Sequence, residues 1–167
     1  MTRIYKALFA AAASAAIAAF GVTAASPAAS ASPAASGTEH FSLMTTQPSA
    51  SKYAIIASGV FTAGGVDVSG SSTDTAKFAN GTFKIHHGGK FKIVKEQLNP
   101  KTCLELFVAK VKFTLGGGTG AYKGLSGAGN ATINDLAIGP RSKGQCNPNA
   151  NPVHNEETIT ATAHVKL

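Results

Sequence analysis

The stretch GGGTGAYKGLSGAGN, residues 116–130, places seven glycines among its first fourteen positions. A glycine-rich loop can cradle a phosphate, or it can let one strand bend sharply onto the next. The spacing fits neither a GxxxxGK[ST] phosphate loop nor a GxGxxG fingerprint, because three residues separate Gly120 from Gly124 and no Lys-Ser/Thr pair follows. The next segment, residues 126–138, alternates like a strand. We therefore predict that the glycines end one strand and let the next curve closely past its neighbours.

Strand-like alternation continues on both sides of this stretch. Residues 103–115 set apolar side chains such as Val111 and Phe113 on one face, with Lys110 and Lys112 on the other. Residues 158–167 alternate in the same way, and no segment beyond the leader has clean helical spacing. About eight strands joined by short turns, with no helix to cover a sheet, predict one all-β antiparallel domain. Such a domain is either a closed barrel or a sandwich.

Three segments between the strands stand out. Asn80-Gly81 lies between two alternating runs and predicts a two-residue hairpin turn, since both positions would need positive φ. A second turn is predicted at residues 87–90. Residues 139–157 contain three prolines and show no strand or helix pattern, so we expect a long loop there.

The N-terminus has the features of a secretory signal peptide. Arg3 and Lys6 precede an uncharged, alanine-rich run over residues 7–22, with small-residue cleavage sites near Ala24 and Ala31. We assign residues 1–24 to the signal peptide, 25–37 to a disordered Ala/Ser/Pro linker and 38–167 to a single barrel domain. The expected location is extracellular, with no membrane insertion.

Charge and cysteine content limit the function classes. Beyond the leader, thirteen Lys and Arg face eight Asp and Glu, but only Arg141 is an arginine and there is no Trp. This composition argues against a nucleic-acid-binding protein. Cys103 and Cys146 are the only cysteines, and an even count in a secreted chain predicts one disulfide. A metal-binding pair and a catalytic thiol are the alternatives.

The glycine motif carries a resemblance to a known family. GGTGAYKGLSGAG, residues 117–129, resembles the GGTGxYxGxxGxG signature of the dirigent and allene oxide cyclase-like barrels. The segments AKFANGTFKIHH and NPKTC, followed by a late cysteine, are similar to small secreted bacterial members of that group. The resemblance implies an eight-stranded antiparallel barrel of the calycin type with a small central cavity. The motif glycines to which we give this structural role are Gly117, Gly118, Gly120, Gly124, Gly127 and Gly129.

Few residues suggest chemistry. Glu105 has the same parity as Val111, so an uninterrupted strand would point its carboxylate into the core, where desolvation raises its pKa. If the strand starts late or bulges near Cys103, Glu105 lies instead at a wet barrel mouth. His86 and His87 are adjacent and point to opposite faces of a strand, with His87 on the apolar side. We expect no metal site and no cofactor, and we name no catalytic residue beyond the weak candidates Glu105 and His87.

Three functions remain open from the sequence. The leading hypothesis is a secreted, non-enzymatic barrel that binds a small hydrophobic ligand. The second is a cofactor-free enzyme of the cyclase or dirigent kind. The third is an extracellular interaction protein that acts through residues 139–157. No feature of the sequence predicts an oligomeric state.

Overall fold

The computed structural model describes residues 35–47, 51–88, 90–147 and 149–167. The predicted signal peptide, residues 1–24, and the linker up to residue 34 lie outside these ranges. The first strand begins at Ser36, so residues 36 and 37 belong to the barrel domain and not to the linker that the sequence indicated. No helix among the described residues is long and apolar enough to span a membrane.

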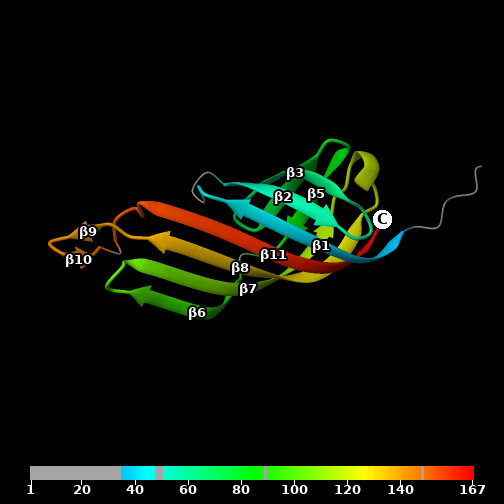
Figure 1. The fold of residues 1–167 in the computed structure, drawn as a ribbon. Coiled ribbons are helices and arrows are strands. Elements are labelled where there is room, and N and C mark those ends of the chain that lie inside the picture. Colours follow the sequence, from blue (N-terminus) through cyan, green and yellow to red (C-terminus); the bar gives the residue numbers. More distant parts are fainter. Residues whose placement is uncertain (1–34, 48–50, 89, 148) are drawn as a thin grey trace, which may run out of the picture. The chain divides into compact units, whose positions relative to one another are not determined.

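The described chain consists of strands and one 3-10 turn (Figure 1). The elements are β1 (Ser36–Thr45), β2 (Lys52–Ser58), β3 (Ala63–Val68), β4 (Thr73–Phe78), β5 (Gly81–His86), β6 (Lys92–Asn99), β7 (Leu104–Gly116), η2 (Gly120–Tyr122), β8 (Ser126–Ile138), β9 (Arg141–Ser142), β10 (Gln145–Cys146) and β11 (His154–Lys166).

Eight strands close into an antiparallel barrel. The main sheet runs β5-β4-β3-β2-β1-β11-β8-β7-β6, and β5 also pairs with β7. That closing contact joins residues 84–86 of β5 to residues 114–116 of β7. The predicted eight-stranded antiparallel barrel is therefore confirmed, and the sandwich alternative is wrong.

The ninth strand, β6, lies outside the closed barrel. It pairs with the first part of β7, from Leu104 to Lys110, while β5 uses only the last three residues of the same strand. β7, β8 and β11 are thirteen residues long and run on past the shorter strands (Figure 1). We call β6 with residues 104–108, 134–138 and 154–158 the sheet extension.

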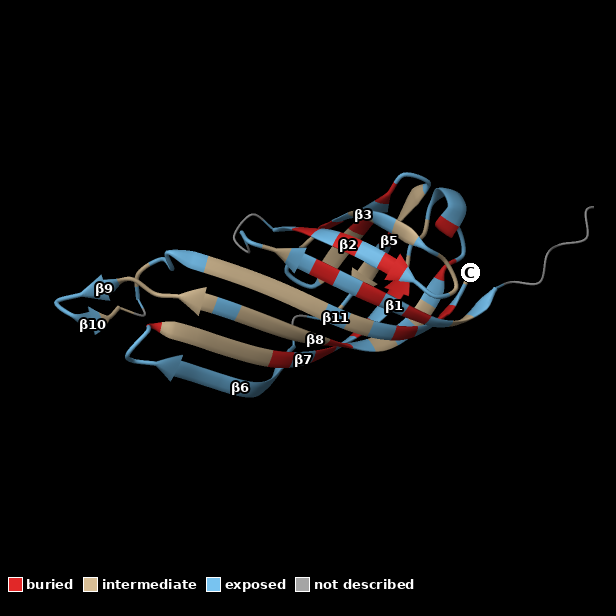
Figure 2. Cartoon of the chain, in the orientation of Figure 1, coloured by how far each residue is buried: buried red, intermediate tan, exposed pale blue. Residues whose placement is uncertain are grey.

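Aromatic side chains fill one end of the barrel. Their ring centroids lie 5.1–6.5 Å apart, within the range of favourable aromatic pairs. We call this cluster the aromatic plug; its members are Phe41, Phe61, Phe78, Phe83 and Tyr122. Figure 2 shows the fully buried positions concentrated in the barrel strands, whereas β6 is exposed along its whole length.

The glycine stretch brings backbones together at this closed end. Gly120 has φ +58°, and a Cβ there would overlap the carbonyl oxygen of Asn80. The adjacent amide of Ala121 donates to that same carbonyl at 2.8 Å, which ties η2 to the β4–β5 turn and places Tyr122 in the plug. In β8, a Cβ on Gly129 would overlap the carbonyl oxygen of Thr162.

The other four motif glycines each have either a positive φ or a backbone carbonyl where a Cβ would lie. Positive φ is found at Gly117 and Gly124, and a Cβ would meet a backbone carbonyl at Gly118 and Gly127.

Two predicted connections differ from the structure. The β4–β5 turn consists of Ala79 and Asn80, because Gly81 already pairs with Phe78; the predicted Asn80-Gly81 turn is one residue out of register. The carbonyl of Asn80 instead accepts the Ala121 amide, and the backbone of Gly81 lies close to the carbonyl of Thr119. Residues 139–157 are not wholly irregular, since they contain the β9–β10 hairpin and the first four residues of β11.

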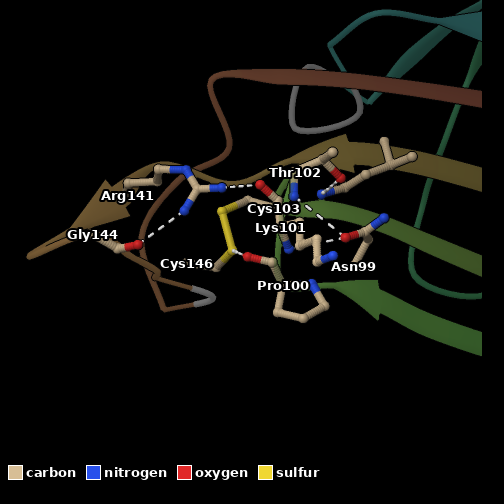
Figure 3. The surroundings of a disulfide bond; sticks show 9 residues. Asn99, Pro100, Lys101, Thr102, Cys103, Arg141, Gly144 and Cys146 are labelled. Carbon is tan, nitrogen blue, oxygen red and sulfur yellow. Dashed lines mark hydrogen bonds between the residues drawn. A yellow bond between two sulfur atoms is a disulfide. The ribbon is translucent and has the colours of Figure 1, made fainter.

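The predicted disulfide joins Cys103 to Cys146 and anchors that hairpin (Figure 3). The Arg141 guanidinium donates to the carbonyl of Gly144 at 2.9 Å and also to the carbonyl of Lys101. These contacts fasten the hairpin to the β6–β7 turn. Closing a loop between cysteines 43 positions apart stabilises the fold by roughly 4 kcal/mol in the loop-entropy model.

The contact between η2 and the β4–β5 turn predicts an effect that is specific to position. Gly120→Ala should lower the free energy of unfolding by at least about 2 kcal/mol, because it combines left-handed strain with a backbone clash. Gly116→Ala is the matched control, since its φ is ordinary and nothing lies within 4 Å of a Cβ there. Urea denaturation measures both; equal stabilities for the two variants would contradict this account of the motif.

Candidate ligand cavity at the barrel mouth

The barrel is open at the end opposite the aromatic plug, and a cavity of about 230 Å³ lies there. Its wall is apolar. The wall residues are Phe41, Leu43, Ile85, Phe91, Val111, Phe113, Ala131, Ile133, Ile159 and Ala161. A dry cavity of about 150 Å³ already accommodates benzene in another protein, so this one is large enough for a small organic ligand.

Polar residues complete the lining at the mouth. Five of them are titratable, Tyr53, Asp67, Asp74, His87 and Glu157, and residues 69–71 between β3 and β4 also line the cavity. Tyr53 and Asp67 are paired neighbours on β2 and β3, so their side chains emerge on the same inner face. Glu157 shares the parity of the inward Ile159 on β11. The mouth is thus assembled from strands that are distant in the sequence.

Asp67 is the most buried of these groups. It is 1% exposed, and its Oδ1 has no hydrogen-bond partner. Burial, and secondarily repulsion from Asp74, raise the pKa of Asp67 from its ordinary value of 3.8 to about 7. The side chain can therefore hold or release a proton near neutral pH inside an apolar cavity.

Asp74 has more hydrogen-bond partners than Asp67. Its Oδ1 accepts a hydrogen bond from the Gly70 amide at 2.9 Å and lies 3.2 Å from Nε2 of His87. The His87 ring also stacks against Phe91, with centroids 6.4 Å apart. Asp74 and His87 form a partly buried pair that can neutralise itself when the imidazole is protonated.

Glu157 hydrogen-bonds the Tyr53 hydroxyl. Burial raises the pKa of both groups, and the charge of Asp135 adds to the effect on Glu157. Asp135 pairs with Glu157 across β8 and β11, and Glu105 in turn raises the pKa of Asp135 beyond the effect of burial. Carboxylates thus continue from the mouth onto the inner face of the sheet extension.

The acidic and basic residues are segregated in the described part of the chain. All thirteen Lys and Arg residues there are exposed, and none lines the cavity. Seven of the eight Asp and Glu residues are buried or half-buried; only Glu96 is exposed. The cavity carboxylates therefore have no Lys or Arg partner to offset the cost of burying them.

The two weak catalytic candidates lie in different places. His87 lies on the cavity wall, on the side of Ile85. Glu105 is half-buried on the sheet extension, paired with Leu98 and Ala137, and does not line the cavity. The strand is continuous through Glu105, but β7 has not yet entered the barrel there, because its first residues pair with β6. Within the described ranges, no three His, Cys, Asp or Glu side chains are grouped to hold a metal ion.

Sequence reasoning missed the most unusual carboxylates. Carboxylates near turns usually accept backbone hydrogen bonds, but of Asp67, Asp74 and Asp135 only Asp74 does so, from the Gly70 amide. Asp67 is flanked by Val66 and Val68, so local alternation would have pointed the valines inward. Glu39 is fully buried at the closed end, where it accepts from the Phe61 amide at 3.1 Å. Its parity with the inward Phe41 was a usable signal.

No protein-family model, curated protein or solved structure matches this chain.

The burial of Asp67 predicts a pH-dependent stability. The pKa of Asp67 is higher in the folded protein than in the unfolded chain. Its contribution to the free energy of unfolding is therefore fully present below about pH 4 and is lost as the pH rises through 7. Asp67→Asn should abolish that loss, making the variant more stable than the parent at pH 8 by up to about 4 kcal/mol and similar to it at pH 4. Chemical denaturation at both pH values measures this, with the exposed Glu96→Gln as control. A variant less stable than the parent at pH 8 would contradict the prediction.

Proposed function

We propose that this protein is a secreted carrier or receptor that binds a small, largely apolar molecule in the barrel cavity. The observation that carries the proposal is the cavity itself: an apolar chamber of about 230 Å³ with a few polar groups gathered at its mouth. This combination of apolar walls and a few convergent polar groups is typical of small-molecule sites. Secretion is part of the proposal and is supported by the signal-peptide features of residues 1–24.

The size and shape of the cavity favour a ligand of about one aromatic ring. The aromatic plug occupies the closed end, so a ligand could enter only at the mouth, past Tyr53, Asp67 and His87. Rigid barrel strands position most of the wall, which favours a pre-formed site. The resemblance of the glycine motif to allene oxide cyclase-like barrels is consistent with this proposal and remains part of it.

Filling the cavity tests the proposal. Ala161 lines the chamber, and Ala161→Leu should remove space that a ligand needs. In the parent, 2-phenylethanol should shift the NMR methyl signals of Val111 and Ile133, and the variant should lose at least about tenfold in affinity, because one or two kcal/mol of contacts disappear.

Thr160→Leu is the matched control, because the neighbouring side chain is exposed on the outer face of β11. It should bind like the parent. Absence of binding to the folded parent, or binding that survives Ala161→Leu, would argue against use of the cavity.

A second function, cofactor-free proton-transfer catalysis, is favoured by Asp67. A carboxyl with a pKa near 7 in an apolar chamber is suited to general acid–base chemistry. In this second function, Asp67 is the general acid or base, in place of the sequence candidate Glu105. If a substrate is turned over, the rate should follow an apparent pKa near 7, and Asp67→Asn should abolish turnover while ligand binding persists. A pH-independent rate, or full activity in the variant, would exclude Asp67 as the acid or base.

The third hypothesis, a partner bound through residues 139–157, receives less support. The β9–β10 hairpin is held by the disulfide and by Arg141, contacts that account for its conformation without a partner.

A further inference from the structure

Among the described residues, no Lys or Arg lines the cavity beside the carboxylates at its mouth. Asp67 has one oxygen without a hydrogen bond although it is 1% exposed and lines the cavity. Glu157 lines the same cavity and is hydrogen-bonded to a neutral phenol, and Asp74 has only His87 as a countercharge. The thirteen Lys and Arg side chains of the described residues all point to solvent.

A buried carboxylate is normally paired or becomes protonated, because leaving it charged in an apolar site is costly. Asp67 could have been retained for packing, but an apolar or amide side chain of its size would pack without that cost. Glu39 and Asp135 also have a buried oxygen without a hydrogen bond, but only Asp67 among these carboxylates lines the apolar chamber. This position indicates that its partner enters with the ligand. The partner that suits a carboxylate is a cation that donates hydrogen bonds.

The walls restrict what kind of cation fits. Phe41, Phe113 and Phe91 line the chamber together with Tyr53, and aromatic faces attract organic cations as well as apolar rings. A bare metal ion would find few ligands in such a chamber. An aromatic ring against the apolar wall, with a short chain leading to the mouth, would place a charged group among the carboxylates.

We propose that the ligand of this cavity is a small aromatic amine, whose protonated nitrogen is held by Asp67 and Glu157 while its ring lies against the phenylalanine wall. This inference rests on the proposed function, since it names the chemical class of the ligand for the same chamber. The Asp74–His87 pair borders the site.

The assignment predicts a ranking of three probes that share one ring. Phenethylamine is cationic, 2-phenylethanol is neutral and 3-phenylpropionate is anionic at pH 7.5, while all three are close in size. Titrations of the full chain, followed by calorimetry or NMR, should show phenethylamine binding at least about tenfold more tightly than the alcohol. The anion should bind most weakly.

The pH dependence follows from the groups that face Asp67. These are Tyr53 from β2, Asp74 from β4, His87 beyond β5 and Glu157 from β11; Asp135 of β8 lies next to Glu157, and the wall from β1 and β7 is apolar. Asp67, with a pKa of about 7, must lose its proton to bind the amine. Affinity for phenethylamine should therefore rise roughly tenfold between pH 6 and 8, while that for the alcohol stays nearly constant.

Two adjacent acids provide matched variants. Glu157 faces the cavity, whereas Glu156 is on the opposite face of β11, so both Gln variants remove the same charge from the same strand. Glu157→Gln and Asp67→Asn should each lower phenethylamine affinity at least about fivefold and leave the alcohol unaffected. Glu156→Gln should behave like the parent.

The three probes and the two Glu→Gln variants distinguish the amine assignment from the proposed function. Preference for the amine that is lost in Glu157→Gln and kept in Glu156→Gln supports the proposal. If the alcohol or the anion binds as tightly as the amine, the amine assignment is overturned while the cavity remains a binding site. If none of the three binds to the folded protein, both this inference and the proposed function fail. Asp67→Asn removes an unpaired buried charge and keeps the shape, so loss of folding is not expected to obscure the result.

Discussion

The structure depends on where the barrel closes. Only three residue pairs join β5 to β7, between residues 84–86 and 114–116, and they occupy the last part of a thirteen-residue strand. Antiparallel closure removes the free sheet edges of the barrel. Because the closing contact is short and lies near one end, the rest of β7 is free to pair with β6. One end of the barrel is consequently sealed by aromatic side chains, and the other opens beside the sheet extension.

This asymmetry separates two kinds of buried carboxylate. Glu39 at the closed end is fully buried, and its Oε2 accepts the Phe61 amide. Backbone hydrogen bonds at that turn partly offset the effect of burial on its pKa. Asp67 at the open end has no such backbone bond to lower its pKa, and a second carboxylate lies nearby. Both carboxylates have one oxygen without a hydrogen bond, but Glu39 accepts a backbone amide at a turn, whereas Asp67 lines the cavity.

Much of the barrel could be predicted from the sequence, because long strands such as Cys103–Leu115 alternate clearly and the glycine spacing excludes a nucleotide loop. The site was harder to predict. Asp67 lies between two valines, and local alternation suggests that it faces outward; pairing of β3 with the strongly patterned β2 fixes the opposite orientation. Glu105 shows the reverse case. Its parity is that of the core, but the sequence holds no signal for the position at which β7 enters the barrel.

In the proposed complex, a cationic ligand supplies the partner that the cavity carboxyl of Asp67 lacks among the described residues. The most direct measurement is an NMR titration of the Asp67 side-chain carboxyl carbon in the free protein and in the protein saturated with phenethylamine. We expect a pKa of about 7 in the free protein and a clear decrease in the complex, because a bound ammonium favours the carboxylate. A pKa near the ordinary 3.8 in the free protein, or one that does not move in the complex, would contradict it.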